Sequence, residues 1–348
     1  MNRTAAAAGL LERLRFLAPR RWHGLVAFNY HRIGDPAGSA LDRDLWSAQA
    51  EELDRQVAFL GTELDVVHAR DLPELQRRGR GRHALITFDD GYRDNYDIAY
   101  PVLRRRGVPA VFFVTTGFLD GPRVAWWDEI SWMVRRSERS TLDASPWWGD
   151  SLELGGDRAQ AIRRLHGVYK TLPTARGNGL LGALAEATGS GRCPANEASA
   201  TWMTWDMARE MRDGGMAIGG HTVTHPVLAR MDHAGQEAEI AGCGRRLQEE
   251  LGEPMRWFAY PVGGRDAFDA STREHLAAAG VELAFSYYGG HRRYDDWDPF
   301  DVRRIPVELD VTGARFRSLA SWPALIGAPR GEQLAVRIRD TVRGWVGL

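Results

Sequence analysis

Nearly continuous apolar runs alternate along this chain with stretches in which apolar residues recur at helical spacing. The apolar runs predict β-strands, which we place at Leu25–His31, Asp65–Ala69, His83–Phe88, Ala110–Thr116, Met216–Gly219, Trp257–Tyr260, Leu283–Tyr287 and Val302–Val307. The intervening stretches predict helices at Leu45–Leu60, Asn95–Arg106, Trp205–Gly214, Ala234–Leu251 and Phe268–Ala279. Strands that alternate with helices indicate a buried parallel sheet, either an α/β barrel or a doubly wound sheet.

The alternation is interrupted between Trp126 and Trp205. A helical pattern covers Ile162–Leu184, and several tryptophans crowd the same region: Trp126, Trp127, Trp132, Trp147 and Trp148. We interpret residues 126–205 as a helical, Trp-rich insertion in a domain that spans residues 25–310. We expect the tryptophans to form a core of their own, and stacking of one or two of them on sugar rings is the alternative.

Short helices that carry arginine are predicted near both ends of the chain. Leu10–Leu17 lies in an N-terminal amphipathic extension, residues 1–24, and Gln333–Leu348 lies in a C-terminal helical extension, residues 311–348. We expect both to pack on the domain, and loose contact with an anionic membrane surface is the alternative. There is no run of eighteen apolar residues and no clear signal peptide, so we expect a cytoplasmic protein, with the inner face of the membrane as the alternative location.

Composition narrows the class of protein. Hydrophobic residues make up 44% of the 348 positions and charged residues 26%, which is typical of a globular chain. The net charge of −1 provides no global attraction to nucleic acid. Two cysteines, Cys193 and Cys243, are too few for a disulfide framework or a zinc cluster of cysteines.

Two adjacent carboxylates, Asp89 and Asp90, end the strand His83–Phe88, and Gly91 follows them. The C-terminal edge of a parallel sheet or barrel is where ligands bind. Neighbouring carboxylates repel each other, so we expect a divalent metal on one and a cationic side chain on the other.

A pair of histidines and one arginine are the candidate partners. His221 and His225 follow a predicted strand and two glycines, and on a helical turn their spacing would place both imidazoles on one face. Two imidazoles and a carboxylate are the ligand set of a catalytic divalent metal with open positions. Arg256, before the strand Trp257–Tyr260, is the candidate cation for the second carboxylate.

Three segments together resemble the first three motifs of the NodB-homology polysaccharide deacetylases, carbohydrate esterase family 4: Thr87–Gly91, His221–His225 and Arg256–Gly263. Tyr30–Ile33 also resembles the first strand of many bacterial members. The resemblance implies a distorted (β/α) barrel with fewer than eight strands, and metal-dependent hydrolysis of an N-acetyl sugar. A catalytically inactive glycan-binding protein on the same fold is the alternative function.

The resemblance also implies a role for each residue of these motifs. Asp90, His221 and His225 would hold one divalent ion; zinc is expected, with cobalt, manganese and nickel as alternatives. Asp89 would be the general base, Arg256 would orient it, and the backbone N–H of Tyr260 would face the oxyanion.

The end of the chain departs from the family pattern. Typical members use a histidine from a late motif to protonate the leaving amine, and no histidine follows Val307. Arg303–Val307 resembles the late strand of members that lack this histidine. The acid could be His31, His291 or a water, so it is left open. The expected substrate is an N-acylated amino sugar in a glycan or on a nucleotide or lipid carrier, destined for exopolysaccharide.

Overall fold

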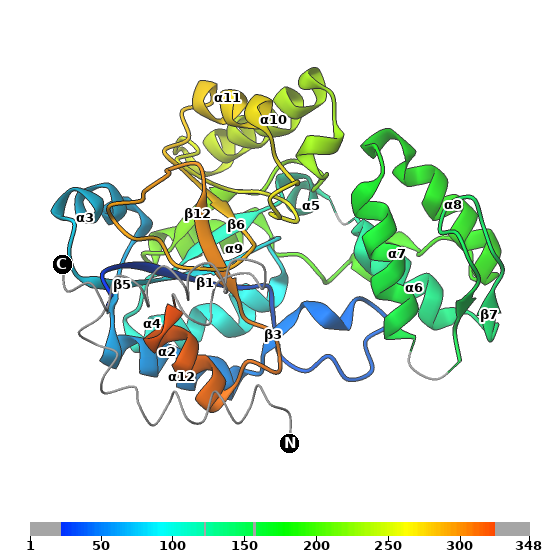
Figure 1. Cartoon of the computed structure of the whole chain (residues 1–348), viewed down its shortest axis with the longest axis horizontal. Helices are drawn as coiled ribbons and strands as arrows, with labels where there is room; N and C mark the ends of the chain where they lie inside the picture. Colours follow the sequence, from blue (N-terminus) through cyan, green and yellow to red (C-terminus); the bar gives the residue numbers. More distant parts are fainter. Residues whose placement is uncertain (1–21, 122, 156–157, 324–348) are drawn as a thin grey trace, which may run out of the picture.

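The computed structural model describes residues 22–121, 123–155 and 158–323. Within these residues, seven parallel strands close into a barrel because β1 pairs with both β5 and β12. In order around the barrel they are β1 (Gly24–Tyr30), β12 (Val302–Pro306), β11 (Leu283–Ser286), β10 (Trp257–Ala259), β9 (Ala217–Gly220), β6 (Val111–Val114) and β5 (Arg82–Phe88). This confirms the predicted distorted (β/α) barrel with fewer than eight strands (Figure 1).

The distortion lies beside β5. Its first half pairs with the short strand β4 (Asp65–Val66), and its last two residues pair with β6. The strand β4 therefore covers the part of β5 that β6 does not reach, and the barrel closes without an eighth full strand.

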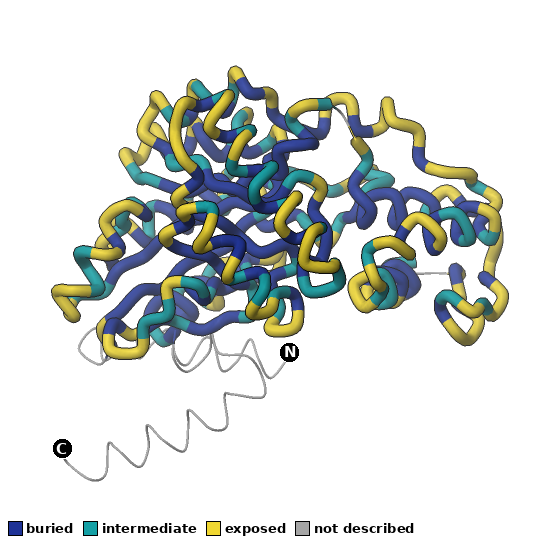
Figure 2. The backbone as a smooth tube through the Cα atoms, turned by 90° about the horizontal axis from the view of Figure 1, so that it is seen from above, coloured by how far each residue is buried: buried dark blue, intermediate teal, exposed yellow. Residues whose placement is uncertain are grey.

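Helices surround the barrel (Figure 1), and its strands are buried (dark blue in Figure 2). The outward-facing side chains of the strands pack in one core with the helices. The helices are α2 (Ala50–Glu63), α3 (Leu72–Arg78), α4 (Tyr100–Arg106), α5 (Thr116–Asp120), α9 (Trp205–Asp213), α10 (His233–Leu251), α11 (Ala270–Ala278) and α12 (Gly313–Ser321). On β1, Val26 and Phe28 belong to the core beneath the helices, whereas Leu25 and Ala27 belong to the core inside the barrel. This alternation is the two-residue period of a strand that is buried on both faces.

The interior of the barrel changes from apolar to polar toward the C-terminal edge. Leu25 and Ala27 are followed inside by Asn29, and Leu85 on β5 is followed by Thr87. Asn29 and Thr87 are buried and hydrogen-bonded to each other (2.9 Å). A polar layer therefore lies directly below the edge at which the candidate residues gather.

The Trp-rich region forms a lobe beside the barrel (Figure 1). It contains α6 (Trp126–Arg136), a small hairpin of β7 (Thr141–Leu142) and β8 (Leu152–Glu153), α7 (Ala159–Thr171) and α8 (Gly177–Thr188). The single helical stretch expected at Ile162–Leu184 is two helices, because α7 ends before Pro173. Buried tryptophans fill the core of the lobe: Trp126, Trp127, Trp132 and Trp148.

The two terminal helices predicted at Leu10–Leu17 and Gln333–Leu348 lie outside the described residues. Among the helices that are described, none has the length and apolar character needed to cross a membrane.

Candidate metal centre and active site

The strand β5 brings two adjacent carboxylates to the C-terminal edge of the barrel. Asp89 follows the strand directly, and its backbone N–H donates to the Tyr30 carbonyl on β1 (3.0 Å). The chain then turns, because Asp90 (φ 75°) and Gly91 (φ 90°) adopt left-handed conformations. After this turn Asp89 contacts Arg304 inside the barrel, whereas Asp90 faces two histidines.

The histidines lie on the loop between β9 and α10. The prediction of a helical turn is wrong, because Thr222 (φ 67°) and His225 (φ 60°) are left-handed and the loop is irregular. Glu239 on α10 holds this loop by accepting hydrogen bonds from two of its backbone N–H groups (2.8 Å each). His221 and His225 are nevertheless brought to the same carboxylate.

Three donor atoms converge at this point. Asp90 Oδ1 lies 3.3 Å from His221 Nε2 and 3.3 Å from His225 Nε2, and all three side chains are buried. Ligand atoms at about 2.0–2.2 Å from a tetrahedral ion are roughly 3.3–3.6 Å apart, so the observed spacing fits a divalent metal. Within the described residues, Asp90 Oδ1 is buried without a hydrogen-bond partner, which is unfavourable unless a cation satisfies it.

The orientation of the histidines and the charge around them also fit a metal ligand set. His221 Nδ1 donates to the Ala259 carbonyl (2.7 Å), which orients Nε2 toward Asp90. Burial acts to lower the pKa of His221, but Asp89 and Asp90 outweigh it and raise that pKa. Burial lowers the pKa of His225. Burial acts to raise the pKa of Asp90, but the two imidazoles lower it, so the carboxylate is ionised. The site thus attracts positive charge, and a proton and a metal would compete for it.

Arg304 on β12 is the cation that holds Asp89. Its fully buried guanidinium donates to Asp89 Oδ1 (2.6 Å) and Oδ2 (2.8 Å), and also to Asn29 Oδ1 (2.6 Å). Burial acts to raise the pKa of Asp89, but Arg304 outweighs it and the pKa lies below its ordinary value. Asp89 is therefore a fixed, ionised carboxylate, with the orientation set by a two-pronged ion pair.

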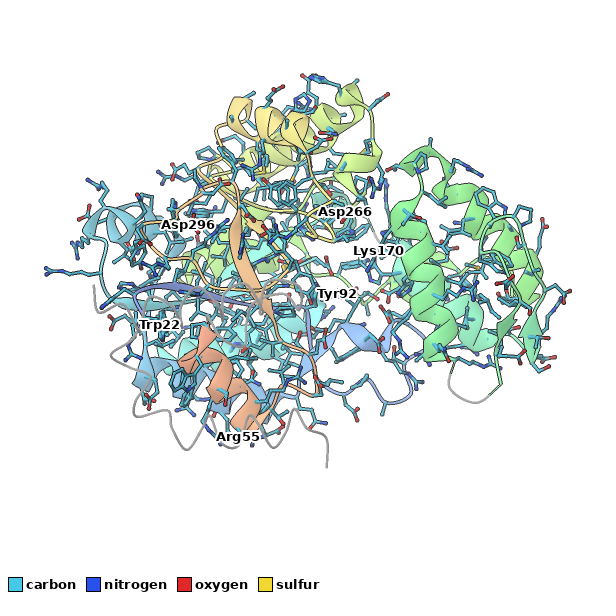
Figure 3. The ribbon with its side chains drawn as sticks, viewed as in Figure 1. Trp22, Arg55, Tyr92, Lys170, Asp266 and Asp296 are labelled. Carbon is cyan, nitrogen blue, oxygen red and sulfur yellow. The ribbon has the colours of Figure 1, made fainter. Side chains whose placement is uncertain are left out.

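A cavity of about 320 Å³ opens above these residues. Asp89, Asp90 and both histidines line it. The lobe supplies a further part of the wall, from α6 and α7: Trp126, Trp127, Arg163, His166, Gly167 and Lys170. Lys170 is labelled in Figure 3, on the side of the lobe nearest the barrel. Two tryptophans therefore contribute both to the lobe core and to the cavity wall.

Backbone strain is concentrated at the same place. Among the described residues, the non-glycine residues with positive φ are Asp90, Thr222, His225 and Val262. Three of them line the cavity, and Thr222 accepts a hydrogen bond from the His225 N–H (2.9 Å). Such conformations cost about 1–3 kcal/mol each and persist mainly at functional sites.

Comparison with known proteins gives this site a context. A family model described as "Polysaccharide deacetylase" matches residues 76–139 and 181–284. The chain belongs to the polysaccharide deacetylase family. Escherichia coli poly-beta-1,6-N-acetyl-D-glucosamine N-deacetylase is 29% identical over 177 residues, which are 45% of this chain. The match covers only 25% of that curated relative.

Solved structures of deacetylases share the fold. The Streptococcus pyogenes deacetylase PplD, in complex with acetate, aligns with a TM-score of 0.55 and 16% identity over 84% of this chain and 96% of that chain. IcaB from Ammonifex degensii aligns with a TM-score of 0.53 and 21% identity over 87% of this chain and 97% of that chain. The family match omits residues 140–180, which include α7, so part of the cavity wall lies outside the matched deacetylase segments.

Arg256 does not have the role that the deacetylase resemblance implied. It precedes β10 at the N-terminal edge of the barrel and pairs with Glu282 on the surface (2.8 Å), where both side chains are largely exposed. Asp89 lies at the opposite edge, so Arg256 cannot orient it, and Arg304 does so instead. The sequence signal for Arg304 was its position in the late strand Val302–Val307, where it faces inward two residues after Val302.

The proposed oxyanion donor also needs correction. The Tyr260 N–H donates to the Phe285 carbonyl on β11 (3.0 Å), so it is occupied by the sheet. Val262, two residues later, is left-handed (φ 63°) and lines the cavity. Within the described residues its N–H has no acceptor, which makes it an available backbone donor at the cavity wall.

The two candidate acids lie at opposite ends of the barrel. His31 directly follows β1 at the C-terminal edge, lines the cavity and packs its ring against Tyr287 (5.5 Å between centroids). Burial lowers its pKa. His291 packs on Trp22, next to the residue that pairs with the start of β1, so it lies at the N-terminal edge and is excluded from the site.

Proposed function

We propose that this protein is a metal-dependent hydrolase that removes the N-acetyl group from an amino sugar of a glycan. The observation that supports this proposal most directly is the buried set of Asp90, His221 and His225 beside the ionised Asp89 in one cavity. Family membership supports deacetylation of a polysaccharide, and the donor set supports a zinc ion.

The chain's own residues can supply the groups that amide hydrolysis needs. A divalent ion bound by Asp90 and the two histidines would polarise the amide carbonyl and make its water acidic near neutral pH. Asp89, held by Arg304, accepts the proton of the attacking water. The Val262 N–H donates to the oxygen on which negative charge develops.

His31 is the residue that we propose to protonate the leaving nitrogen. It lies on the cavity, at the same edge as Asp89. Because burial lowers its pKa, the imidazole is neutral at rest. The proton that it donates to the leaving nitrogen must therefore reach it first, and we propose that this is the proton that Asp89 takes from the attacking water. Replacement of His31 by Gln should therefore slow product formation while bound metal is retained, and loss of metal in that variant would assign His31 to the metal site.

The reaction is tested by acetate release from N-acetylglucosamine oligomers. Protein stripped with a chelator should be inactive and should regain activity with one equivalent of Zn²⁺. His221→Ala should lose both bound metal and activity, whereas His68→Ala, at a histidine away from the cavity, should lose neither. Stoichiometric metal without turnover on any N-acyl sugar would contradict the enzymatic proposal and favour an inactive glycan-binding protein.

For the substrate, we propose a short or carrier-linked N-acyl amino sugar that is processed in the cytoplasm on its way to an exopolysaccharide. The support is the cavity itself, which at about 320 Å³ is near the lower end of small-molecule pockets and is walled by α7. Nucleotide-linked or lipid-linked N-acetyl sugars should release acetate faster than chitin oligomers or peptidoglycan. Release from the polymers alone would contradict this choice and leave the deacetylase chemistry intact.

A further inference from the structure

A second cluster of metal-binding side chains lies on the pair of helices α10 and α11, on the outside of the barrel (Figure 1). His233 is the first residue of α10, Glu237 lies one turn later on the same helix, and His275 lies on α11. One ligand atom of each lies within 4.8 Å of the others. None of the three residues lines the active-site cavity.

These side chains do not use their donor atoms on other described groups of the protein. His275 is 9% exposed, and its Nε2 is buried without a hydrogen-bond partner. The ring centroids of His233 and His275 are 4.2 Å apart, and the two ring planes are inclined at 73°. Within the described residues, no hydrogen bond or ion pair is recorded for Glu237 or His233, although arginine is abundant in this chain. A buried imidazole nitrogen without a partner is unfavourable, so a ligand at this point would satisfy it.

We propose that His233, Glu237 and His275 form a second metal site, for a divalent ion that prefers imidazole, with Zn²⁺ as the expected ion. Two nitrogens and one carboxylate suit zinc and disfavour Mg²⁺ and Ca²⁺, which prefer oxygen ligands. Bound ligand atoms would be about 3.3–3.6 Å apart, so atoms that lie within 4.8 Å of one another need to approach by at most about 1.5 Å. His233 and Glu237 are exposed and can supply this movement by side-chain rotation.

The site would connect α11 to the helix that supports the catalytic loop. Glu239 on α10, which holds the loop of His221 and His225, lies two residues after Glu237. A metal at the second site would therefore be structural, tying α10 to α11, and would leave the first site free to act independently.

The test counts Zn²⁺ bound to the full chain by equilibrium dialysis and elemental analysis. The unmodified protein should bind two equivalents, and His221→Ala/His225→Ala should still bind one. Adding His233→Ala to that double variant should remove the remaining equivalent, and adding Glu237→Gln should weaken its binding at least tenfold. His68→Ala in the same background is the matched control and should change nothing. Mg²⁺ should not occupy the site.

Two outcomes would overturn the inference. The double variant could bind no zinc at all, or its remaining zinc could survive His233→Ala. Because His275 is nearly buried, His275→Ala could unfold the protein, and the exposed positions His233 and Glu237 carry the test in that case. The count is made in a background that lacks the first site, so failure of the proposed catalytic metal does not affect it.

Discussion

Replacing Arg304 by Met should destabilise the protein strongly, because it leaves the Asp89 carboxylate buried without a counter-charge. Arg304 is fully buried and donates two hydrogen bonds to Asp89 and one to Asn29. Removing one partner of such a buried ion pair typically costs about 3–5 kcal/mol. Since whole domains have free energies of unfolding of about 5–15 kcal/mol, this is a large part of the total.

Urea unfolding measures the effect, and Arg256→Met is the matched control. Arg256 and Glu282 form an exposed pair, which typically contributes about 0–1 kcal/mol, so the unfolding midpoint should hardly move. If Arg256 were the partner of Asp89, as the family resemblance implied, Arg256→Met would lower the unfolding midpoint more than Arg304→Met.

A double variant separates loss of the charge pair from loss of packing. Asp89→Asn added to Arg304→Met removes the unpaired carboxylate, so the double variant should be more stable than Arg304→Met alone, with a coupling of about 1–3 kcal/mol. If Arg304→Met is no less stable than Arg256→Met, or if Asp89→Asn restores nothing, the assignment of Arg304 as the partner of Asp89 is refuted.

Three further predictions concern the carboxylates and the lobe. Asp89→Asn should keep its bound zinc by elemental analysis and lose about a hundredfold or more in rate, whereas Asp90→Asn should lose the zinc; equal loss of metal would contradict this division. Burial and the nearby Asp128 raise the pKa of Asp42 to about 7. The folded state therefore binds more protons than the unfolded state between about pH 4 and 7, so the free energy of unfolding should fall as pH rises through that window. Asp42→Asn should therefore become more stable relative to the unmodified protein at pH 8 than at pH 5 in thermal unfolding, and a constant difference would rule out Asp42 as the source. Trp127 packs on His225 (4.3 Å between ring centroids), so Trp127→Leu should weaken zinc binding about tenfold in a chelator competition, and unchanged affinity would show that the tryptophan does not position the imidazole.

Much of the barrel could be predicted because its strands are buried on both faces. Each becomes a nearly continuous apolar run, as in Val111–Val114 and Leu283–Ser286, and such runs are visible without knowledge of their partners. The candidate metal residues were found for a related reason. Asp90 comes two residues after β5 and His221 directly follows β9, and in a parallel barrel all strand ends meet at one edge.

Arg304, the ion-pair partner of Asp89, was not predicted, because a sequence motif does not show at which edge of the barrel its residues lie. Arg256 precedes its strand, so the three residues of β10, about 10 Å of strand, separate it from the C-terminal edge. Its side chain therefore remains at the N-terminal edge, away from Asp89. Arg304 lies inside its strand on the inward face and reaches the correct edge from below. Strand direction alone would have excluded the first residue and favoured the second.

The loop conformations could not be predicted, because they depend on contacts between distant segments. Thr222 is β-branched and rarely adopts positive φ. The strain is maintained by hydrogen bonds from the loop to Glu239, which lies on the helix that follows. The helical spacing therefore predicted that His221 and His225 lie together, and they do, but in an irregular loop rather than on a helical turn.

The lobe is the part of the candidate site that was hardest to predict from the sequence, and in the structure it joins that site in two ways. Trp127 at the start of α6 packs against His225, so the lobe contacts the metal centre through a ring rather than through a ligand. Lys170 on α7 lines the same cavity as Asp89 and Asp90, in a stretch that the family model does not match. The barrel thus provides the groups to which we assign the proposed hydrolysis, and the lobe provides part of the cavity wall. Side chains in a cavity wall select substrates both by binding some and by clashing with others. Differences in substrate between this chain and its relatives should therefore depend on α7 more than on the barrel.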